Sequence, residues 1–139
     1  MYLDACILAK LLVPEADSEA CADRVSGRTL VSSDLVYAEI WSMLLRKERE
    51  RQITTRERDA AWAEFERLID HEILWLAAVD KRIIRQSRAV MLAVHPTVPI
   101  RTLDAIHLAT YLSVVTGPLY TVDARMRQAA QLLNVPLVA

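Results

Sequence analysis

Hydrophobic residues occur along the chain in short continuous runs and in longer segments with helical spacing. The short runs are strand candidates, at residues 29–31, 73–79, 119–122 and 135–138. They are apolar throughout, as expected for strands that are covered on both faces of a sheet. Tyr2-Leu3 has the same character but is too short to be assigned alone.

The longer segments are helix candidates, at residues 17–26, 34–51, 55–71, 81–94, 103–116 and 124–133. Gly27 and Gly117 follow two of them, where glycine favours a helix C-terminus. Thr54 and Glu57 have the spacing of a capping box before the 55–71 segment. Strands that alternate with helices predict an α/β fold with a parallel sheet between layers of helices.

Length and composition favour one packed domain, residues 1–139. The chain has 139 residues, of which 53% are hydrophobic and 25% charged, and domains most often contain roughly 100–150 residues. The apolar runs are shorter than the ~20 residues of a membrane span. The start of the chain lacks the basic and apolar regions of a signal peptide. We therefore expect a cytoplasmic protein in which Cys6 and Cys21 are buried, reduced thiols.

Four acids stand at or near the starts of predicted helices: Asp4, Glu39, Asp104 and Asp123. Asp4 and Asp123 directly follow apolar runs, so they fall at the carboxyl edge of the sheet, where open α/β folds bind ligands. Clustered carboxylates raise one another's pKa or recruit a cation, and hard oxygen ligands suit Mg²⁺ or Mn²⁺. The pattern therefore indicates metal-assisted phosphodiester chemistry.

Helix capping is a competing explanation for three of these acids. Asp4 and Asp123 precede helices, where aspartate is a favoured N-cap, and Asp104 lies in a first turn, where the helix dipole favours negative charge. Glu39 lies a full turn inside its segment among apolar residues, where an unpaired acid is costly. The competing explanation for Glu39 is that its side chain faces solvent.

Four stretches in this order resemble PIN domains, specifically the VapC-type toxins of toxin–antitoxin pairs, over the whole chain. They are Tyr2-Leu3-Asp4, Ala38-Glu39, Arg101-Thr102-Leu103-Asp104-Ala105-Ile106-His107-Leu108-Ala109 and Tyr120-Thr121-Val122-Asp123. The resemblance implies a three-layer α/β/α fold with a central, mostly parallel sheet of about five strands. It also implies that Asn134 takes the left-handed conformation of a glycine that often follows the last helix.

The resemblance further implies a Mg²⁺- or Mn²⁺-dependent endoribonuclease toxin that hydrolyses RNA with a metal-activated water, leaving 5′-phosphate and 3′-hydroxyl ends. A cognate VapB-type antitoxin, a homodimer and a toxin–antitoxin hetero-oligomer are implied as well. Thr121 matches a hydroxyl close to the metal, whereas Cys6 replaces the serine or threonine that relatives commonly carry. The implied catalytic and metal-binding residues are Asp4, Glu39, Asp104 and Asp123.

Two other functions are open at this stage. A phosphatase or phosphotransferase of the haloacid dehalogenase type also uses an aspartate after its first strand, but it requires a second aspartate where Cys6 stands. A non-catalytic PIN-fold module would bind RNA or an antitoxin without cleavage, although such modules usually lose the acids. A net charge of −1 argues against tight passive binding of nucleic acid, but not against binding through a metal.

Three further features have ordinary structural explanations. His107 lies one turn after Asp104, but a single histidine on an apolar helix is more often a hydrogen-bonded core group. The charged run 46–51 has acids interleaved among its basic residues, which favours a solvated helix face over a patch that attracts phosphate. The tryptophans are expected in the core: Trp41, Trp62 and Trp75.

Overall fold

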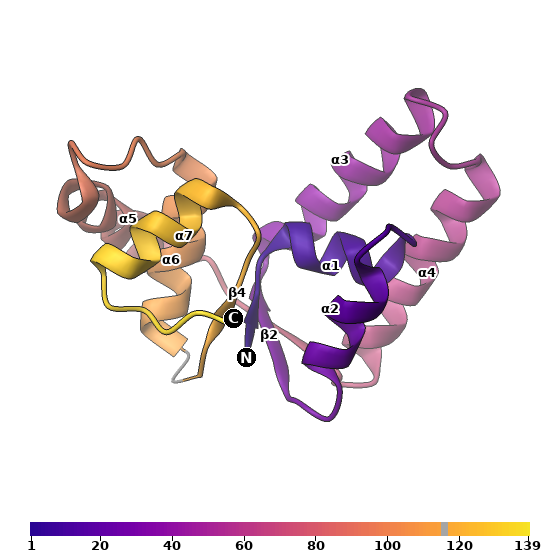
Figure 1. Cartoon of the computed structure of the whole chain (residues 1–139), viewed down its shortest axis with the longest axis horizontal. Helices are drawn as coiled ribbons and strands as arrows, with labels where there is room; N and C mark the ends of the chain where they lie inside the picture. Colours follow the sequence, from indigo (N-terminus) through magenta and orange to yellow (C-terminus); the bar gives the residue numbers. More distant parts are fainter. Residues whose placement is uncertain (115–116) are drawn as a thin grey trace.

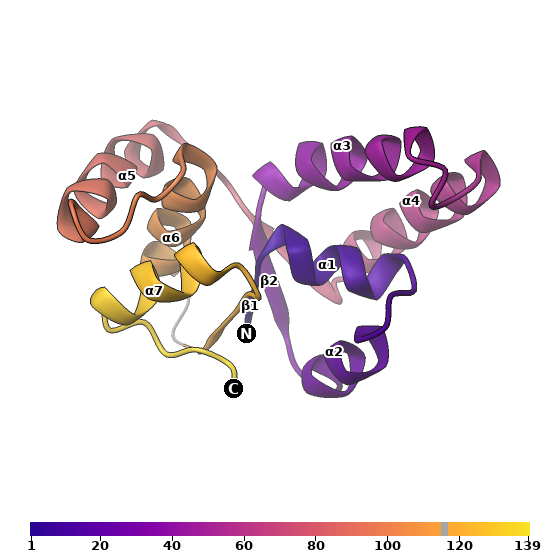
Figure 2. The same cartoon turned by 45° about the horizontal axis from the view of Figure 1, so that its top comes forward.

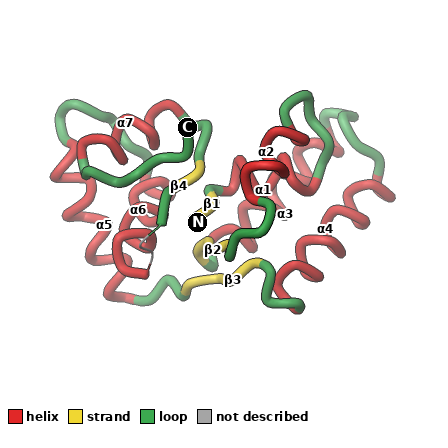
Figure 3. The backbone as a smooth tube through the Cα atoms, turned by 60° about the horizontal axis from the view of Figure 1, so that its bottom comes forward, coloured by secondary structure: helices red, strands yellow, loops and turns green. Residues whose placement is uncertain are grey.

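The computed structural model describes residues 1–114 and 117–139. Its sheet has four parallel strands in the order β3-β2-β1-β4. The strands lie in the middle of the molecule, between two groups of helices (Figure 3). Their bounds are β1 (Tyr2–Leu3), β2 (Leu30–Ser33), β3 (Leu74–Ala77) and β4 (Leu119–Tyr120).

The two-residue strand β1 holds the centre of the sheet. Tyr2 pairs with Val31 of β2 on one side and with Leu119 of β4 on the other. Successive side chains of a strand point to opposite faces, and here Tyr2 and Leu3 enter different hydrophobic clusters, one on each side of the sheet. Pairing on both edges explains why so short a run is ordered as a strand.

Helices cover both faces of the sheet (Figure 1), which confirms the three-layer α/β/α prediction. One group contains α1 (Ala5–Leu12), α2 (Ser18–Val25), α3 (Leu35–Arg49) and α4 (Thr55–Asp70). The other contains α5 (Lys81–Val94), α6 (Thr102–Val114) and α7 (Ala124–Leu132). The predicted helix ends agree within two residues, except that the end expected at residue 116 lies outside the described residues.

Local signals in the sequence act as expected. The Thr54 hydroxyl accepts the Glu57 backbone N–H, and the Glu57 carboxylate accepts the Thr54 N–H at 2.7 Å, so the capping box is present. Gly27 and Asn134 have φ angles of 68° and 55°, the left-handed conformation that ends a helix. The paired helices α3 and α4 extend well beyond the sheet (Figure 2).

Two expectations about strands were wrong. The sheet has four strands rather than about five, because residues 135–138 contribute only the isolated bridge between Leu119 and Leu137. Pro136 has no N–H to donate, so it cannot extend a ladder; its carbonyl accepts the Leu119 N–H. Trp75 of the edge strand β3 is 58% exposed and Trp41 of α3 is 36% exposed, so neither is the core residue that was expected.

The helices give no sign of a membrane span. None of those within residues 1–114 and 117–139 combines sufficient length with sufficient apolar character to cross a bilayer.

Candidate active site

The carboxyl ends of β1 and β4 bring Asp4 and Asp123 to one edge of the sheet. The two strands are parallel neighbours, and the Asp4 N–H donates to the Tyr120 carbonyl at 3.1 Å. The chain continues from β1 to β2 on one side, while β4 lies on the other. Such a reversal of strand order opens a crevice at the carboxyl edge, where ligands bind in open α/β sheets.

Thr121 joins the two aspartates. Its buried hydroxyl donates to Asp4 Oδ2 at 2.7 Å and accepts the Asp123 backbone N–H at 3.1 Å. The Cys6 thiol donates to the same Asp4 oxygen at 3.0 Å. Both donors bind Oδ2, which leaves Asp4 Oδ1 for a ligand. Thr121 thus hydrogen-bonds to the Asp4 side chain and to the Asp123 backbone.

The unusual Cys6 fits this support role. Its side chain is half-buried rather than buried, and burial, together with the nearby charge of Asp4, raises the pKa of the thiol to about 12. The thiol therefore stays protonated near neutral pH and keeps the proton that it donates to Asp4.

Helix capping explains only one carboxylate oxygen, which belongs to Asp123. Asp123 Oδ1 accepts the Met126 N–H at 2.9 Å and so caps α7, which leaves its other oxygen uncommitted. Asp4 occupies the N-cap position of α1 but makes no side-chain capping bond. The capping explanation therefore fails for Asp4 and holds for one oxygen of Asp123.

Asp104 lies in the first turn of α6, and its Oδ2 is buried without a hydrogen-bond partner among the described residues. Burial raises the pKa of this carboxyl, and the charges of Asp123 and Asp4 raise it further. The three aspartates therefore share one electrostatic environment. An unpartnered buried carboxylate oxygen is costly, and a cation is the partner that relieves like charges.

Glu39 reaches the same region from α3 through a bond to His107. His107 Nε2 lies 2.8 Å from Glu39 Oε2. Because a carboxylate only accepts, Nε2 is the donor; Nδ1 lies 2.8 Å from the Tyr2 hydroxyl and accepts from it when the ring is neutral. The Ser33 hydroxyl lies 3.3 Å from that nitrogen. Glu39 is therefore neither a cap nor a freely solvated side chain.

His107 is the core group that its apolar helix suggested, with 1% of its surface exposed. Burial by itself lowers the pKa of the imidazole, but the bond to Glu39 and the charges of Glu39, Asp4 and Asp104 outweigh it and raise the pKa. Its link to Glu39 was not foreseen. His107 lies three residues after Asp104, so both side chains lie on one helix face. This spacing was the signal in the sequence that His107 lies near the acids.

Three of the acids are held by hydrogen bonds in a way that is typical of metal-binding carboxylates. One oxygen is anchored in each of Asp4, Asp123 and Glu39, and ligating carboxylates in metal sites are themselves hydrogen-bonded in this way. Within the part of the chain that the structure describes, no three His, Cys, Asp or Glu side chains already converge as a ligand set. Like charges repel, and a cation between these carboxylates would offset that repulsion.

Comparisons with known proteins agree with this architecture. A model of the PIN domain family matches residues 1–132. A protein named ribonuclease VapC46, from Mycobacterium tuberculosis strain ATCC 25618 / H37Rv, is 36% identical over 142 residues, which cover 100% of this chain and 96% of that protein. Ribonuclease VapC35, from M. tuberculosis strain CDC 1551 / Oshkosh, is 30% identical with the same coverage. The chain belongs to the PIN domain family and, within it, to the VapC type.

Proposed function

We propose that this protein is a Mg²⁺- or Mn²⁺-dependent endoribonuclease toxin that a VapB-type antitoxin neutralises. The observation that carries the proposal is the buried Oδ2 of Asp104, which has no hydrogen-bond partner among the described residues and feels the charges of Asp123 and Asp4. Carboxylate oxygens are hard ligands of the kind that these cations prefer, so the residues fit such an ion. The similar proteins named ribonuclease VapC46 and VapC35 support RNA as the substrate.

In this proposal Asp4, Asp104 and Asp123 hold the cation, and Glu39 is a further ligand or orients the attacking water. A divalent cation in such a site supplies positive charge for the phosphate oxygens and acidifies water. Thr121 and Cys6 fix the rotamer of Asp4 through their bonds to Oδ2. His107 and the Met126 N–H do the same for Glu39 and Asp123, so the acids are oriented before substrate arrives.

Water is the proposed nucleophile because the side chains around the acids are unsuited to covalent catalysis. The raised pKa of Cys6 keeps it a neutral thiol, and the thiolate is the reactive form. His107 is buried with both ring nitrogens engaged, so it is not available as a base for Cys6. If water attacks the phosphorus in line with the P–O3′ bond, that bond breaks and the 3′ oxygen leaves as a hydroxyl, which gives the 5′-phosphate and 3′-hydroxyl ends that the resemblance implies.

A surface for the antitoxin is supported by an apolar groove of about 320 Å³ between α1 and α4. Its lining residues are Leu12, Val13, Pro14, Ile53, Glu57, Ala60, Ala61 and Glu64. Tyr37 and Trp41 of α3 are 47% and 36% exposed. Exposed apolar surface of this kind favours a protein partner, and we assign it to the antitoxin and to homodimer formation.

Removal of divalent cations tests the proposed activity. Purified protein incubated with total RNA is expected to produce fragments with 5′-phosphate ends in Mg²⁺ or Mn²⁺, and none in EDTA, because the acids alone supply no positive charge to the phosphate. The ends are identified by sequencing libraries that require a 5′-phosphate. A metal-independent mobility shift of RNA without cleavage would instead indicate the non-catalytic binding module.

A further inference from the structure

We propose that Arg46 and Arg49 bind the phosphates of the RNA strand next to the cleavage point, a proposal that rests on the nuclease function above. Both arginines line a groove of about 520 Å³ that also contains Glu39 and Cys6 of the candidate site. The groove therefore runs from Glu39, the one candidate acid in its lining, along α3. Its remaining lining residues are Ala5, Ala38, Ser42, Met43 and Leu103.

The spacing of α3 places these arginines in line with Glu39. Residues three or four apart lie on one helix face, and Glu39, Ser42, Arg46 and Arg49 follow this spacing along the groove. At 1.5 Å per residue, Arg46 and Arg49 lie ~10 Å and ~15 Å along the helix axis from Glu39. A strand that leaves the acids along this face meets the two guanidinium groups in turn.

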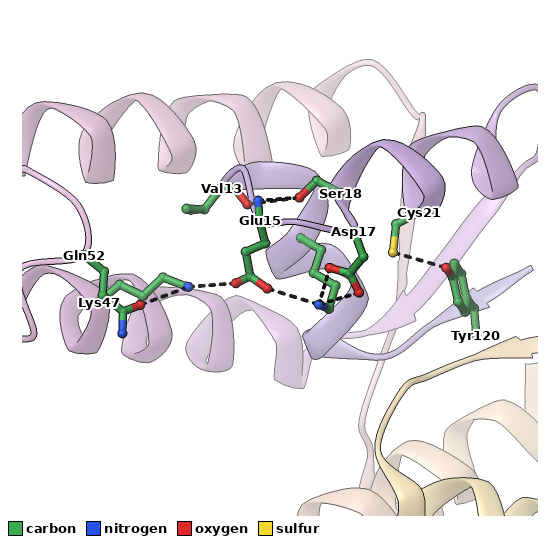
Figure 4. A network of polar contacts seen from close by, with 9 residues as sticks. Val13, Glu15, Asp17, Ser18, Cys21, Lys47, Gln52 and Tyr120 are labelled. Atoms are coloured by element: carbon green, nitrogen blue, oxygen red, sulfur yellow. Dashed lines mark hydrogen bonds and ion pairs between the residues drawn. The ribbon is translucent and has the colours of Figure 1, made fainter.

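The charged run that contains these arginines is divided into a paired and an unpaired part. Lys47 binds Glu15 at 2.7 Å, as Figure 4 shows, and Arg58 binds Glu48 at 2.7 Å. Across residues 1–114 and 117–139, Arg46 and Arg49 form no side-chain hydrogen bond or ion pair, and both are exposed. Lys47 and Glu48 are therefore paired and half-buried, whereas Arg46 and Arg49 lie exposed along the groove without an ion-pair partner among the described residues.

RNA fits this groove better than a polypeptide does. A phosphodiester chain carries one negative charge per nucleotide, so a strand with its reacting phosphate at the acids also supplies phosphates to Arg46 and Arg49. A polypeptide would need a basic group for Glu39 and separate acidic groups for the arginines. The guanidinium fork binds phosphate oxygens in pairs, and the apolar walls, such as Met43 and Leu103, suit bases and riboses. The arginines also give a protein of net charge −1 a local attraction for RNA.

The salt dependence of RNA binding tests this assignment in Arg46→Gln, Arg49→Gln and the double variant. Arg85→Gln is the matched control, because Arg85 is an exposed arginine on α5, outside the groove. The probe is a fluorescein-labelled oligouridylate of about 12 nucleotides, within the site sizes of single-strand binders. Anisotropy is measured in EDTA, where the proposed cleavage does not occur, between about 50 and 200 mM KCl.

We expect each groove substitution to reduce the slope of log K against log [KCl] by about 0.7, the value for one phosphate contact to a single strand. The double variant should lose about 1.4, while Arg85→Gln keeps the wild-type slope. Thermal melting verifies that all variants are folded. An unchanged slope in the double variant would overturn the proposal and favour a polypeptide as the occupant of the groove. An equal loss of slope in Arg85→Gln would also overturn it, because RNA would then be attracted by the overall charge of the protein rather than by the two groove arginines.

Cleavage of the same oligonucleotide in Mn²⁺ separates this proposal from the nuclease function. The double variant is expected to raise KM with little change in kcat, because the arginines bind the strand in the ground state and the transition state alike. If wild type cleaves the oligonucleotide and the double variant has the same KM, the role of the two arginines is contradicted and the nuclease function is not. If wild type does not cleave, the nuclease function is contradicted. The salt dependence of binding then still shows whether Arg46 and Arg49 bind RNA phosphates.

Discussion

Asp104→Asn is expected to reduce metal-dependent RNA cleavage by more than about 100-fold, since even partners outside the ligand shell of a metal cost roughly 10–100-fold. The amide keeps the shape of the side chain but removes the negative charge beside Asp4 and Asp123. Initial rates of oligonucleotide cleavage in Mn²⁺ measure the loss. A variant that is folded and cleaves at the wild-type rate would show that Asp104 does not act in the site.

The same substitution is expected to leave the metal-free protein at least as stable as wild type. Burial and the charges of Asp123 and Asp4 raise the pKa of Asp104 in the fold. A group with a raised folded pKa contributes stability below its unfolded pKa, and this contribution is lost as the pH rises through the folded pKa. Wherever the carboxyl is charged in the fold it therefore opposes folding, and the amide removes that cost. Thermal melting in EDTA at pH 7 should give an equal or higher Tm.

His107→Leu is expected to lower the free energy of unfolding by about 2–4 kcal/mol, because the buried hydroxyls of Tyr2 and Ser33 and the carboxylate of Glu39 lose a partner. It should also reduce cleavage by roughly 10–100-fold, since Glu39 loses the bond that orients it. Urea denaturation measures the first effect. Cleavage rates below the unfolding transition measure the second.

Tyr2→Phe separates the two roles of His107. It removes only the hydroxyl on the Nδ1 side and keeps the Nε2 bond to Glu39. Stability should fall by about 1 kcal/mol, while cleavage stays close to wild type. Equal losses of activity in Tyr2→Phe and His107→Leu would mean that His107 stabilises the core without positioning Glu39.

Much of the fold is predictable because its signals are local. Apolar runs, the Thr54 capping box and Gly27 each act within a few residues, so the helices begin and end close to their expected positions. The placement of Asp4 and Asp123 follows from the same information, because parallel strands end at one edge. The failure at residues 135–138 was also local: an apolar run was given more weight than the missing N–H of Pro136.

The pairings that define the candidate site depend on packing between distant segments. Glu39 and His107 are 68 residues apart, and Thr121 and Asp4 are 117 apart. No local sequence pattern specifies that Lys47 forms an ion pair with Glu15 while its neighbour Arg46 lines the groove. Such contacts arise only when the helices have packed on the sheet, so they required the structure.

Titration of Mn²⁺, followed by the loss of its free-ion electron paramagnetic resonance signal, tests most directly whether the four acids hold a cation. Wild type should bind saturably, and Asp104→Asn should bind at least about 10-fold more weakly because a ligand charge is lost. Asp23→Asn, which makes the same change on the exposed face of α2, should match wild type. No saturable binding by wild type, or equal binding by Asp104→Asn, would contradict a metal site at these residues.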